Sequence, residues 1–270
     1  MDVAGKVFVV TGGGNGIGRE VVLLLLKRGA RVAAVDLSPE RLAETQALAG
    51  PAASRLSTHV VNVTDLAAVE KLPQAVLDAH GQIDGLLNVA GIIQRFVHFS
   101  DLETAEIERV LSVNFWGVVN MVKAFLPYLM AMPESSLVNV SSMGAFIPVP
   151  GQTVYGASKA AVKLLTEGLH AELRNSPVRV TVVFPGAVAT SITQNSGVRA
   201  PAVAGANENA ANQKILAPSA AAEIIVNGMQ KGAYRVVVGS DARVMDWFTR
   251  LVPERAMTMI ADRMAGLLQR

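Results

Sequence analysis

Short runs of β-branched residues alternate with amphipathic stretches along almost the whole chain. The expected strands are Lys6–Thr11, Arg31–Asp36, Leu56–Val61, Ile83–Val89, Ser136–Val140, Val178–Phe184 and Tyr234–Val238. The expected helices are Gly16–Arg28, Pro39–Ala49, Asp65–Ala79, Leu102–Met132 and Thr153–Arg174. Strands that alternate with helices of this length need crossover connections, which make neighbouring strands parallel. The pattern predicts an α/β fold with one doubly wound parallel sheet of about seven strands and helices on both faces.

No segment divides the chain into separate domains. Its 270 residues could form one large domain or two small ones, but no linker rich in Pro, Gly and Ser and no internal repeat is found, so residues 1–270 are expected to form a single domain. Residues 190–216 are rich in Ala, Asn and Gly, which suits a substrate lid or a plain surface loop. Residues 241–270 carry apolar side chains at near-helical spacing. This helical tail is expected to pack on the core or another subunit, or to lie on a membrane surface.

Composition and charge exclude several classes of protein. Hydrophobic residues make up 51% of the chain and charged ones 17%, as in a packed globular protein. The net charge is only +2 and the 24 Lys and Arg residues are scattered, so no nucleic-acid partner is expected. The absence of cysteine excludes disulfides, thiolate metal sites and cysteine nucleophiles, and no metal is expected. Residues 1–10 lack a signal-peptide pattern and Val21–Leu26 is too short to cross a bilayer, so we expect a soluble cytoplasmic protein without membrane association.

A glycine-rich turn follows the first expected strand. It reads Thr11-Gly12-Gly13-Gly14-Asn15-Gly16-Ile17-Gly18 and leads directly into a helix. Glycines let the backbone approach a pyrophosphate, and a helix N-terminus offers free N–H groups and a partial positive charge. Asp36 ends the second strand, 18 residues beyond Gly18, where a carboxylate can accept both ribose hydroxyls of an adenosine and repel a 2′-phosphate. Because Leu37 and not a basic residue follows, we predict NAD rather than NADP; the alternative is that Asp36 merely caps a turn.

Tyr155 and Lys159 lie four residues apart near the start of an expected helix, which places them on one face. A phenol with a pKa near 10 is a poor base at neutral pH. A lysine ammonium about 4 Å away is worth roughly 4 kcal/mol at an effective dielectric near 20, enough to lower that pKa by up to about 3. Such a pair by itself is common and usually forms a solvated helix face.

Two other positions strengthen the interpretation of this pair. Ser141 and Ser142 close the strand Ser136–Val140, and strand carboxyl ends face the ligand crevice of an open parallel sheet. Asn114 lies inside the expected helix Leu102–Met132. There its amide either binds a functional group or simply bonds to backbone or solvent.

In this order the motifs resemble those of the short-chain dehydrogenases/reductases, from about Lys6 to Val238. The spacing Thr-Gly-x-x-x-Gly-x-Gly is similar to that of the compact branch of this family. Other segments resemble further motifs: Asn88-Val89-Ala90-Gly91 resembles Asn-Asn-Ala-Gly, Asn62-Val63 resembles an Asp-Val adenine contact, and Pro185-Gly186-x-Val188-x-Thr190 resembles the segment that holds the nicotinamide carboxamide. The resemblance implies a Rossmann fold and a homotetramer or homodimer built on the two long helices.

The resemblance also implies the role of each site residue. Tyr155 would exchange a proton with the substrate oxygen, Ser142 would hydrogen-bond that oxygen, Lys159 would bind the nicotinamide ribose and lower the pKa of Tyr155, and Asn114 would position a relaying water. Ser142 is preferred to Ser141 because it precedes Tyr155 by 13 residues, the usual interval in this family. The implied cofactor-binding residues are Gly12, Asn15, Gly16, Ile17, Gly18, Asp36, Asn62, Val63, Asn88, Ala90, Gly91, Tyr155, Lys159, Pro185, Gly186, Val188 and Thr190.

The expected function is NAD-dependent interconversion of a secondary alcohol and a ketone. Residues Ile92–Phe96 and Met143–Pro150 would flank the pocket of such a fold, and both are mostly apolar. They favour a steroid- or lipid-like small molecule over a sugar, unless they simply pack on the core. The alternative function is an NAD-sensing regulatory or scaffold protein without turnover, which could dispense with the tyrosine, lysine and serine that this chain retains.

Overall fold

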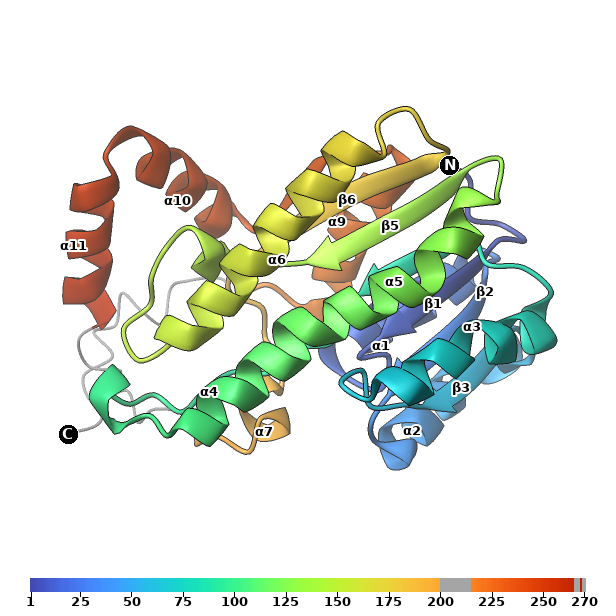
Figure 1. The fold of residues 1–270 in the computed structure, drawn as a ribbon, viewed down its shortest axis with the longest axis horizontal. Coiled ribbons are helices and arrows are strands. Elements are labelled where there is room, and N and C mark those ends of the chain that lie inside the picture. The colour runs from blue at the N-terminus through green and yellow to red at the C-terminus, as the bar shows by residue number, and fades with distance from the viewer. Residues whose placement is uncertain (200–214, 265–267, 269–270) are drawn as a thin grey trace.

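A seven-stranded parallel sheet forms the centre of the computed structural model, which describes residues 1–199, 215–264 and 268. The strand order is β3-β2-β1-β4-β5-β6-β7, with every neighbouring pair parallel (Figure 1). The strands are β1 (Val7–Thr11), β2 (Arg31–Asp36), β3 (Leu56–Val60), β4 (Gly85–Asn88), β5 (Ser135–Val140), β6 (Val178–Pro185) and β7 (Arg235–Val238). The predicted doubly wound α/β fold is therefore confirmed.

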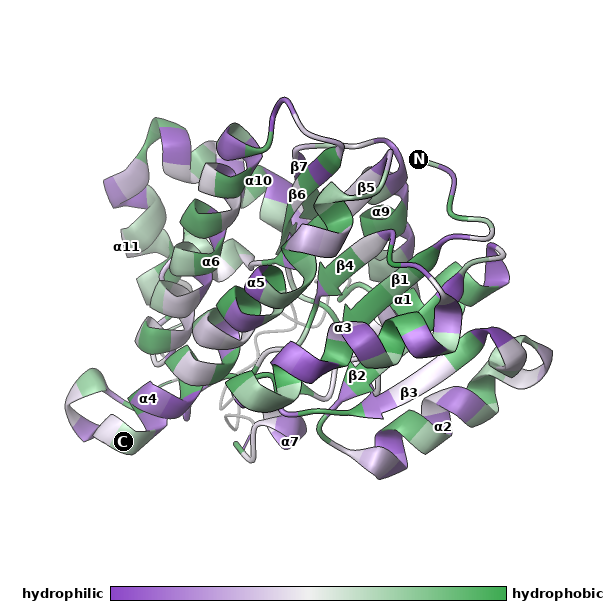
Figure 2. Cartoon of the chain, turned by 45° about the vertical axis from the view of Figure 1, so that its right-hand side comes forward, coloured by the Kyte–Doolittle hydropathy of each residue, from purple (hydrophilic) through white to green (hydrophobic). Residues whose placement is uncertain are grey.

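Helices cover both faces of the sheet (Figure 1). One face carries α1 (Gly16–Lys27), α2 (Pro39–Ala49) and α9 (Pro218–Gln230), and the other carries α3 (Leu66–His80), α5 (Gly117–Met130) and α6 (Thr153–Glu172). Successive side chains of a strand point to opposite faces, so Phe8 and Val10 of β1 join the first core while Val7 and Val9 join the second. In Figure 2 the central strands β1 and β4 are hydrophobic, whereas the edge strand β3 is paler.

Helix α9 is the main element that the sequence analysis does not predict. It lies between the expected lid and the last strand, and Pro218 occupies its first turn, where a missing N–H costs nothing. Its small and branched side chains form a stripe against α1 and the sheet, made of Ala221, Ala222, Ile225, Val226 and Met229. Three alanines in succession near the start of this helix leave no clear helical periodicity of large apolar residues in the sequence.

The predicted helix Leu102–Met132 consists of three pieces. They are α4 (Thr104–Leu111), a π-helical turn (Ser112–Trp116) and α5. A π-turn inserts an extra residue and often marks a functional site. The run Thr104–Met130 is long and apolar enough to cross a membrane by length and composition, but α5 buries Met121, Phe125 and Leu129 in the core beside the sheet. The apolar character of this run is therefore explained by the packing of α5 against the sheet.

The sheet opens a crevice where its connections change direction. Strand β1 pairs with β2 on one side and with β4 on the other, so the connections leaving β1 and β4 run to opposite edges. Ligands of open parallel sheets bind beyond the strand carboxyl ends at such a point.

The expected lid and tail are described in part. Of the segment expected to be a lid, the structure describes a short helix, α7 (Ile192–Asn195), while residues 200–214 lie outside the described part of the chain. The tail forms α10 (Ser240–Leu251) and α11 (Pro253–Met264), which stand beside the end of the sheet (Figure 1).

Candidate active site

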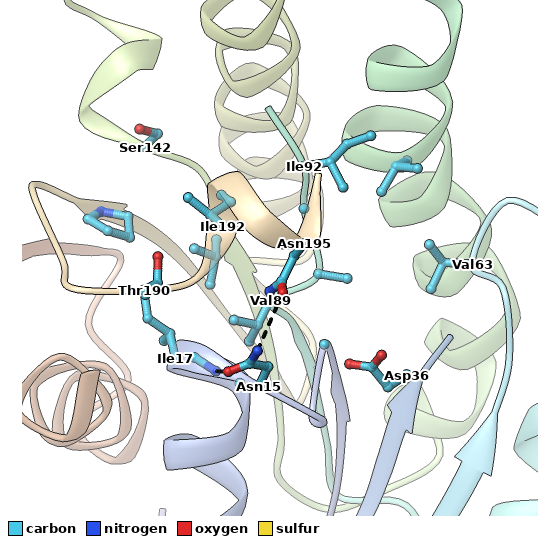
Figure 3. A pocket seen from close by; sticks show the side chains of 18 of the residues that line it. Asn15, Ile17, Asp36, Val63, Val89, Ile92, Ser142, Thr190, Ile192 and Asn195 are labelled. Carbon is cyan, nitrogen blue, oxygen red and sulfur yellow. Dashed lines mark hydrogen bonds between the residues drawn. The ribbon is translucent and has the colours of Figure 1, made fainter. Parts of the chain in front are cut away.

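A cavity of about 440 Å³ opens at the carboxyl ends of the strands. Ligand pockets usually measure about 300–1,000 Å³. Asp36 lies at one end of the cavity and Ser142 at the other, with Ile17, Val89 and Thr190 between them (Figure 3). Most predicted site residues line it: Gly12, Asn15, Gly16, Ile17, Gly18, Asp36, Asn62, Val63, Ala90, Gly91, Ser142, Tyr155, Lys159, Pro185, Gly186, Val188 and Thr190. Asn88 and Asn114 are buried and do not line it.

The glycine-rich turn folds tightly onto the start of α1. Gly12 has a φ of +70°, and a Cβ on Gly18 would lie 2.1 Å from the Gly12 carbonyl oxygen. Asn15 caps α1, since its Oδ1 accepts a hydrogen bond from Gly16 N at 2.6 Å. The backbone thus borders the cavity without intervening side chains, and this cradle fits a nucleotide pyrophosphate at a helix N-terminus.

Alanine at Gly18 is expected to disrupt this turn. The added Cβ would overlap a backbone oxygen that cannot move aside, so we expect the free energy of unfolding to fall by about 3 kcal/mol or more and NAD binding to be lost. Chemical denaturation and calorimetric titration with NAD measure both effects. Gly168→Ala on α6 is the matched control, because its Cβ would meet nothing within 4 Å. This variant should raise the free energy of unfolding by roughly 0.5–1 kcal/mol. Equal stability and NAD affinity of the two variants would contradict the close approach.

Asp36 is held rigidly at the end of β2. Its Oδ2 accepts from Gly14 N at 3.0 Å and its Oδ1 accepts from Ser38 N at 3.1 Å. Arg41 also lines this end of the cavity, from the first turn of α2. Arg41 is missing from the predicted site, because only the folded helix α2 brings it near the carboxylate of Asp36.

Ser142 and Tyr155 meet at the other end of the cavity. A Cβ on Gly144 would lie 3.4 Å from Ser142 Oγ and 3.5 Å from Tyr155 Cε1, so Gly144 leaves room between them. Ser141 also borders the cavity, but its hydroxyl donates to the Lys159 carbonyl at 2.7 Å. This arrangement supports the choice of Ser142 over Ser141.

Burial dominates the electrostatics of Tyr155 and Lys159. Burial raises the pKa of the Tyr155 phenol, and a hydrogen bond with Ser142 acts in the opposite direction. Burial also lowers the pKa of the Lys159 ammonium, to about 8. Its Nζ donates to the Val140 carbonyl at 3.0 Å. Burial sets the direction of both pKa shifts, and the lowering of the Tyr155 pKa by Lys159 stays a prediction.

Replacing Lys159 with methionine is expected to stabilise the protein without cofactor. An unfolded lysine has a pKa of 10.5 and the folded one about 8, so burial of the charge costs about 3 kcal/mol below pH 8. Between these values the unfolded state binds more protons, and the cost falls as pH rises. The variant should therefore exceed the native protein in free energy of unfolding near pH 7, and this excess should shrink above pH 8. Denaturant titrations across this range measure it; an excess that grows with pH would contradict the burial of a charged lysine.

Asn114 lies in the π-turn behind the loop that follows β4. Its Oδ1 accepts from Ile92 N at 2.9 Å, and its Nδ2 donates to the Ile92 carbonyl and to Ser158 Oγ, both at 2.9 Å. A Cβ on Gly91 would lie 3.1 Å from Lys159 Nζ and 3.3 Å from Asn114 Oδ1. Asn114 thus fixes the loop beside Lys159, and the water-positioning role implied for it stays a prediction.

Two further polar residues stabilise the strand ends from inside. Thr11 Oγ1 accepts from Val89 N at 3.0 Å and from Ala90 N at 3.1 Å, which joins the end of β1 to the loop after β4. Asn88 donates to Asn139 Oδ1 at 2.8 Å and so faces β5 instead of the cavity. Its predicted part in cofactor binding stays a prediction.

Helix α7 lies across the cavity and is another feature absent from the sequence prediction. Asn15 Nδ2 donates to Asn195 Oδ1 at 3.4 Å (Figure 3). Ser196 Oγ, just beyond α7, accepts from Ile93 N at 2.9 Å. Ile192 lines the cavity between these anchors. No periodicity marks this segment, so only its place after the Pro185-Gly186 turn could have suggested it.

Comparison with known proteins decides the family. The family model for short chain dehydrogenases matches residues 6–200. The chain belongs to the short-chain dehydrogenase/reductase family. A curated relative named "Putative oxidoreductase SadH", from Mycobacterium tuberculosis, is 36% identical over 265 residues, or 97% of this chain and 96% of the relative. The predicted resemblance is thus confirmed, and the protein is an oxidoreductase of this family.

Solved structures of the family carry either cofactor. A short chain dehydrogenase/reductase from Burkholderia phymatum in complex with NAD matches with a TM-score of 0.81 and 25% identity, over 93% of this chain and 96% of that one. A short chain dehydrogenase from Burkholderia cenocepacia in complex with NADP matches with a TM-score of 0.79 and 27% identity, over 96% and 99%. The preference between NAD and NADP therefore has to be argued from this chain's own residues.

Proposed function

We propose that this short-chain dehydrogenase/reductase uses NAD to interconvert a secondary alcohol and a ketone, with Tyr155 as the acid–base residue. The observation that carries the proposal is that Ser142, Tyr155 and Lys159 line the same cavity as the glycine-rich turn and Asp36. Asp36, fixed by two backbone N–H groups, favours ribose hydroxyls over a 2′-phosphate.

In the proposed oxidation, the alcohol gives a proton to one acceptor and a hydride to another. When bound, the nicotinamide ring supplies the hydride acceptor for alcohol oxidation. Tyr155 as phenolate takes the hydroxyl proton of the alcohol, while Ser142 donates a hydrogen bond to the same oxygen. Among the described residues that line the cavity, the ionisable ones are Asp36, Arg41, Tyr155 and Lys159. Since Asp36 and Arg41 belong to the adenosine end, Tyr155 and Lys159 are the groups left to exchange this proton.

An apolar substrate fits the lining near Tyr155 better than a sugar does. Ile92, Val113 and Ile192 contribute apolar side chains to the lining of the cavity. The expected flanking segments contribute less than predicted, because Phe146 packs on Phe184 with ring centroids 5.4 Å apart and Gln94 is buried away from the cavity. Assays of NAD reduction with steroid, long-chain and sugar alcohols test this proposal. Turnover of the apolar alcohols supports it, and turnover of sugar alcohols alone overturns it.

Self-association through α5 and α6 is also proposed. Trp116, in the π-turn before α5, is 55% exposed, and Leu164 on α6 is 69% exposed. Large apolar side chains in such positions favour burial in a homodimer or homotetramer. A cytoplasmic location is part of the same proposal, and it agrees with a chain that lacks cysteine.

A further inference from the structure

We propose that Gln94 is a positioning residue for the reaction, because its side chain caps the helix that carries Tyr155 and fixes where that helix begins. The inference rests on the function proposed above for Tyr155. Gln94 lies in the loop after β4 and its side chain is completely buried, although glutamine is rarely buried in this way. It does not line the cavity, so it would act through Tyr155 and not on the substrate.

The side-chain oxygen of Gln94 serves the start of α6. Gln94 Oε1 accepts from Val154 N at 2.7 Å and from Tyr155 N at 3.0 Å. The first N–H groups of a helix have no partner within the helix and need an acceptor from elsewhere. The residue at the N-cap position, Gln152, forms no side-chain cap of its own. Gln94, 60 positions before Val154 in the sequence, therefore supplies this acceptor for the helix that carries Tyr155.

A second hydrogen bond makes the contact reciprocal. Gln152 Nε2 donates to the Gln94 carbonyl at 2.8 Å, so the start of α6 also bonds to the backbone of the loop that contains Gln94. These backbone partners fix both amides: Gln94 has to present its oxygen and Gln152 its nitrogen. Gln94 Nε2 and Gln152 Oε1 form no hydrogen bond with the residues that the structure describes.

The loop that contains Gln94 also forms part of the wall of the cavity that Tyr155 lines. Ala90 and Gly91 of this loop line the cavity, and Ile93 N is bonded to Ser196 beyond α7. The loop after β4 is thus bonded to the segment following α7 through Ile93 and to the start of α6 through Gln94. The contact sets the distance between the Tyr155 phenol and the wall formed by Ala90 and Gly91.

Two variants of Gln94 separate positioning from simple packing. Gln94→Met fills the same space without an acceptor, so we expect kcat for alcohol oxidation to fall by about 10- to 100-fold, as misplacement by about 1 Å does. The affinity for NAD should stay within about twofold, because the adenosine end is untouched. Gln94→Glu keeps the acceptors and should restore most of kcat. Its added negative charge near Tyr155 should move the pH–rate profile to higher pH.

The control applies the same substitution far from the site. Gln82→Met removes a hydrogen bond of 2.7 Å to the buried Asp84 at the amino-terminal edge of the sheet. It should lower the melting temperature yet leave kcat and the pH–rate profile unchanged.

A readout without turnover distinguishes failure of this inference from failure of the proposed function. Hydrogen exchange at the amides of Val154 and Tyr155 should accelerate in Gln94→Met and stay slow in Gln94→Glu. Slow exchange in both variants would overturn the cap, whatever the activity. If exchange behaves as expected but kcat and its pH profile match the native enzyme in both variants, Gln94 caps the helix without positioning Tyr155, and the inference is wrong. A native protein that turns over no alcohol would overturn the proposed function and, with it, the positioning role.

Discussion

The Tyr155→Phe variant should lose about 10³-fold in kcat for alcohol oxidation, in the middle of the range that acid–base groups contribute. Phenylalanine keeps the ring and its packing but removes the hydroxyl that exchanges the proton. The phenol is buried beside Ser142 and Lys159, and no other ionisable side chain among the described residues lines that end of the cavity. Steady-state kinetics over a range of pH, combined with NAD titration by fluorescence, would measure the loss. The affinity for NAD should be nearly unchanged, because the glycine-rich turn and Asp36 are intact.

A matched tyrosine distinguishes lost chemistry from lost packing. Tyr128 lies on α5, packed at the margin of the core between that helix and the sheet. Tyr128→Phe removes the same atom far from the cavity and should leave kcat unchanged. If Tyr155→Phe retained more than a tenth of native turnover, a different group would have to move the proton.

Removing the charge of Asp36 should reverse the preference between cofactors. For Asp36→Asn we expect kcat/KM with NAD to fall about 10- to 100-fold, since hydrogen bonds to charged groups are worth about 1.5–3 kcal/mol. The efficiency with NADP should rise, because the carboxylate no longer repels a 2′-phosphate and Arg41 lies at the same end of the cavity. The ratio of the two efficiencies, measured in one assay with both cofactors, is the quantity to compare.

The second substitution Arg41→Ala tests the reason given for this reversal. Added to Asp36→Asn, it should remove most of the gain with NADP and leave the efficiency with NAD little changed. A ratio that stays at the native value in Asp36→Asn would mean that cofactor choice is made elsewhere in the cavity.

The fold is predictable from this sequence because local and global signals agree. Each β-branched run lies between amphipathic segments, and the glycine turn, Asp36 and the Pro185-Gly186 turn all occur where strands end. In an open parallel sheet those ends share one edge, so motifs far apart in the sequence had to meet. Tyr155 and Lys159 could be paired from helical spacing alone.

The remaining features depend on burial and on contacts that no local pattern encodes. The pKa of Tyr155 is raised because the completed fold desolvates it, and a spacing argument contains no measure of desolvation. Arg41 and Asn195 reach the cavity through the path of a helix and a loop. Gln94 and Arg95 are the two polar residues of the stretch Ile92–Phe96, and only the assembled structure reveals the contact of Gln94 with α6.

The most direct measurement of the central claim is a deuterium-transfer experiment. The native protein is incubated with NAD and an apolar secondary alcohol deuterated at its carbinol carbon, and the reduced cofactor is examined by mass spectrometry and NMR. Our account predicts that the deuterium appears at C4 of the nicotinamide ring and that the yield falls about 10³-fold in Tyr155→Phe. Reduced cofactor that carries no deuterium would contradict this account. So would the formation of no reduced cofactor from any apolar secondary alcohol, although NAD binds.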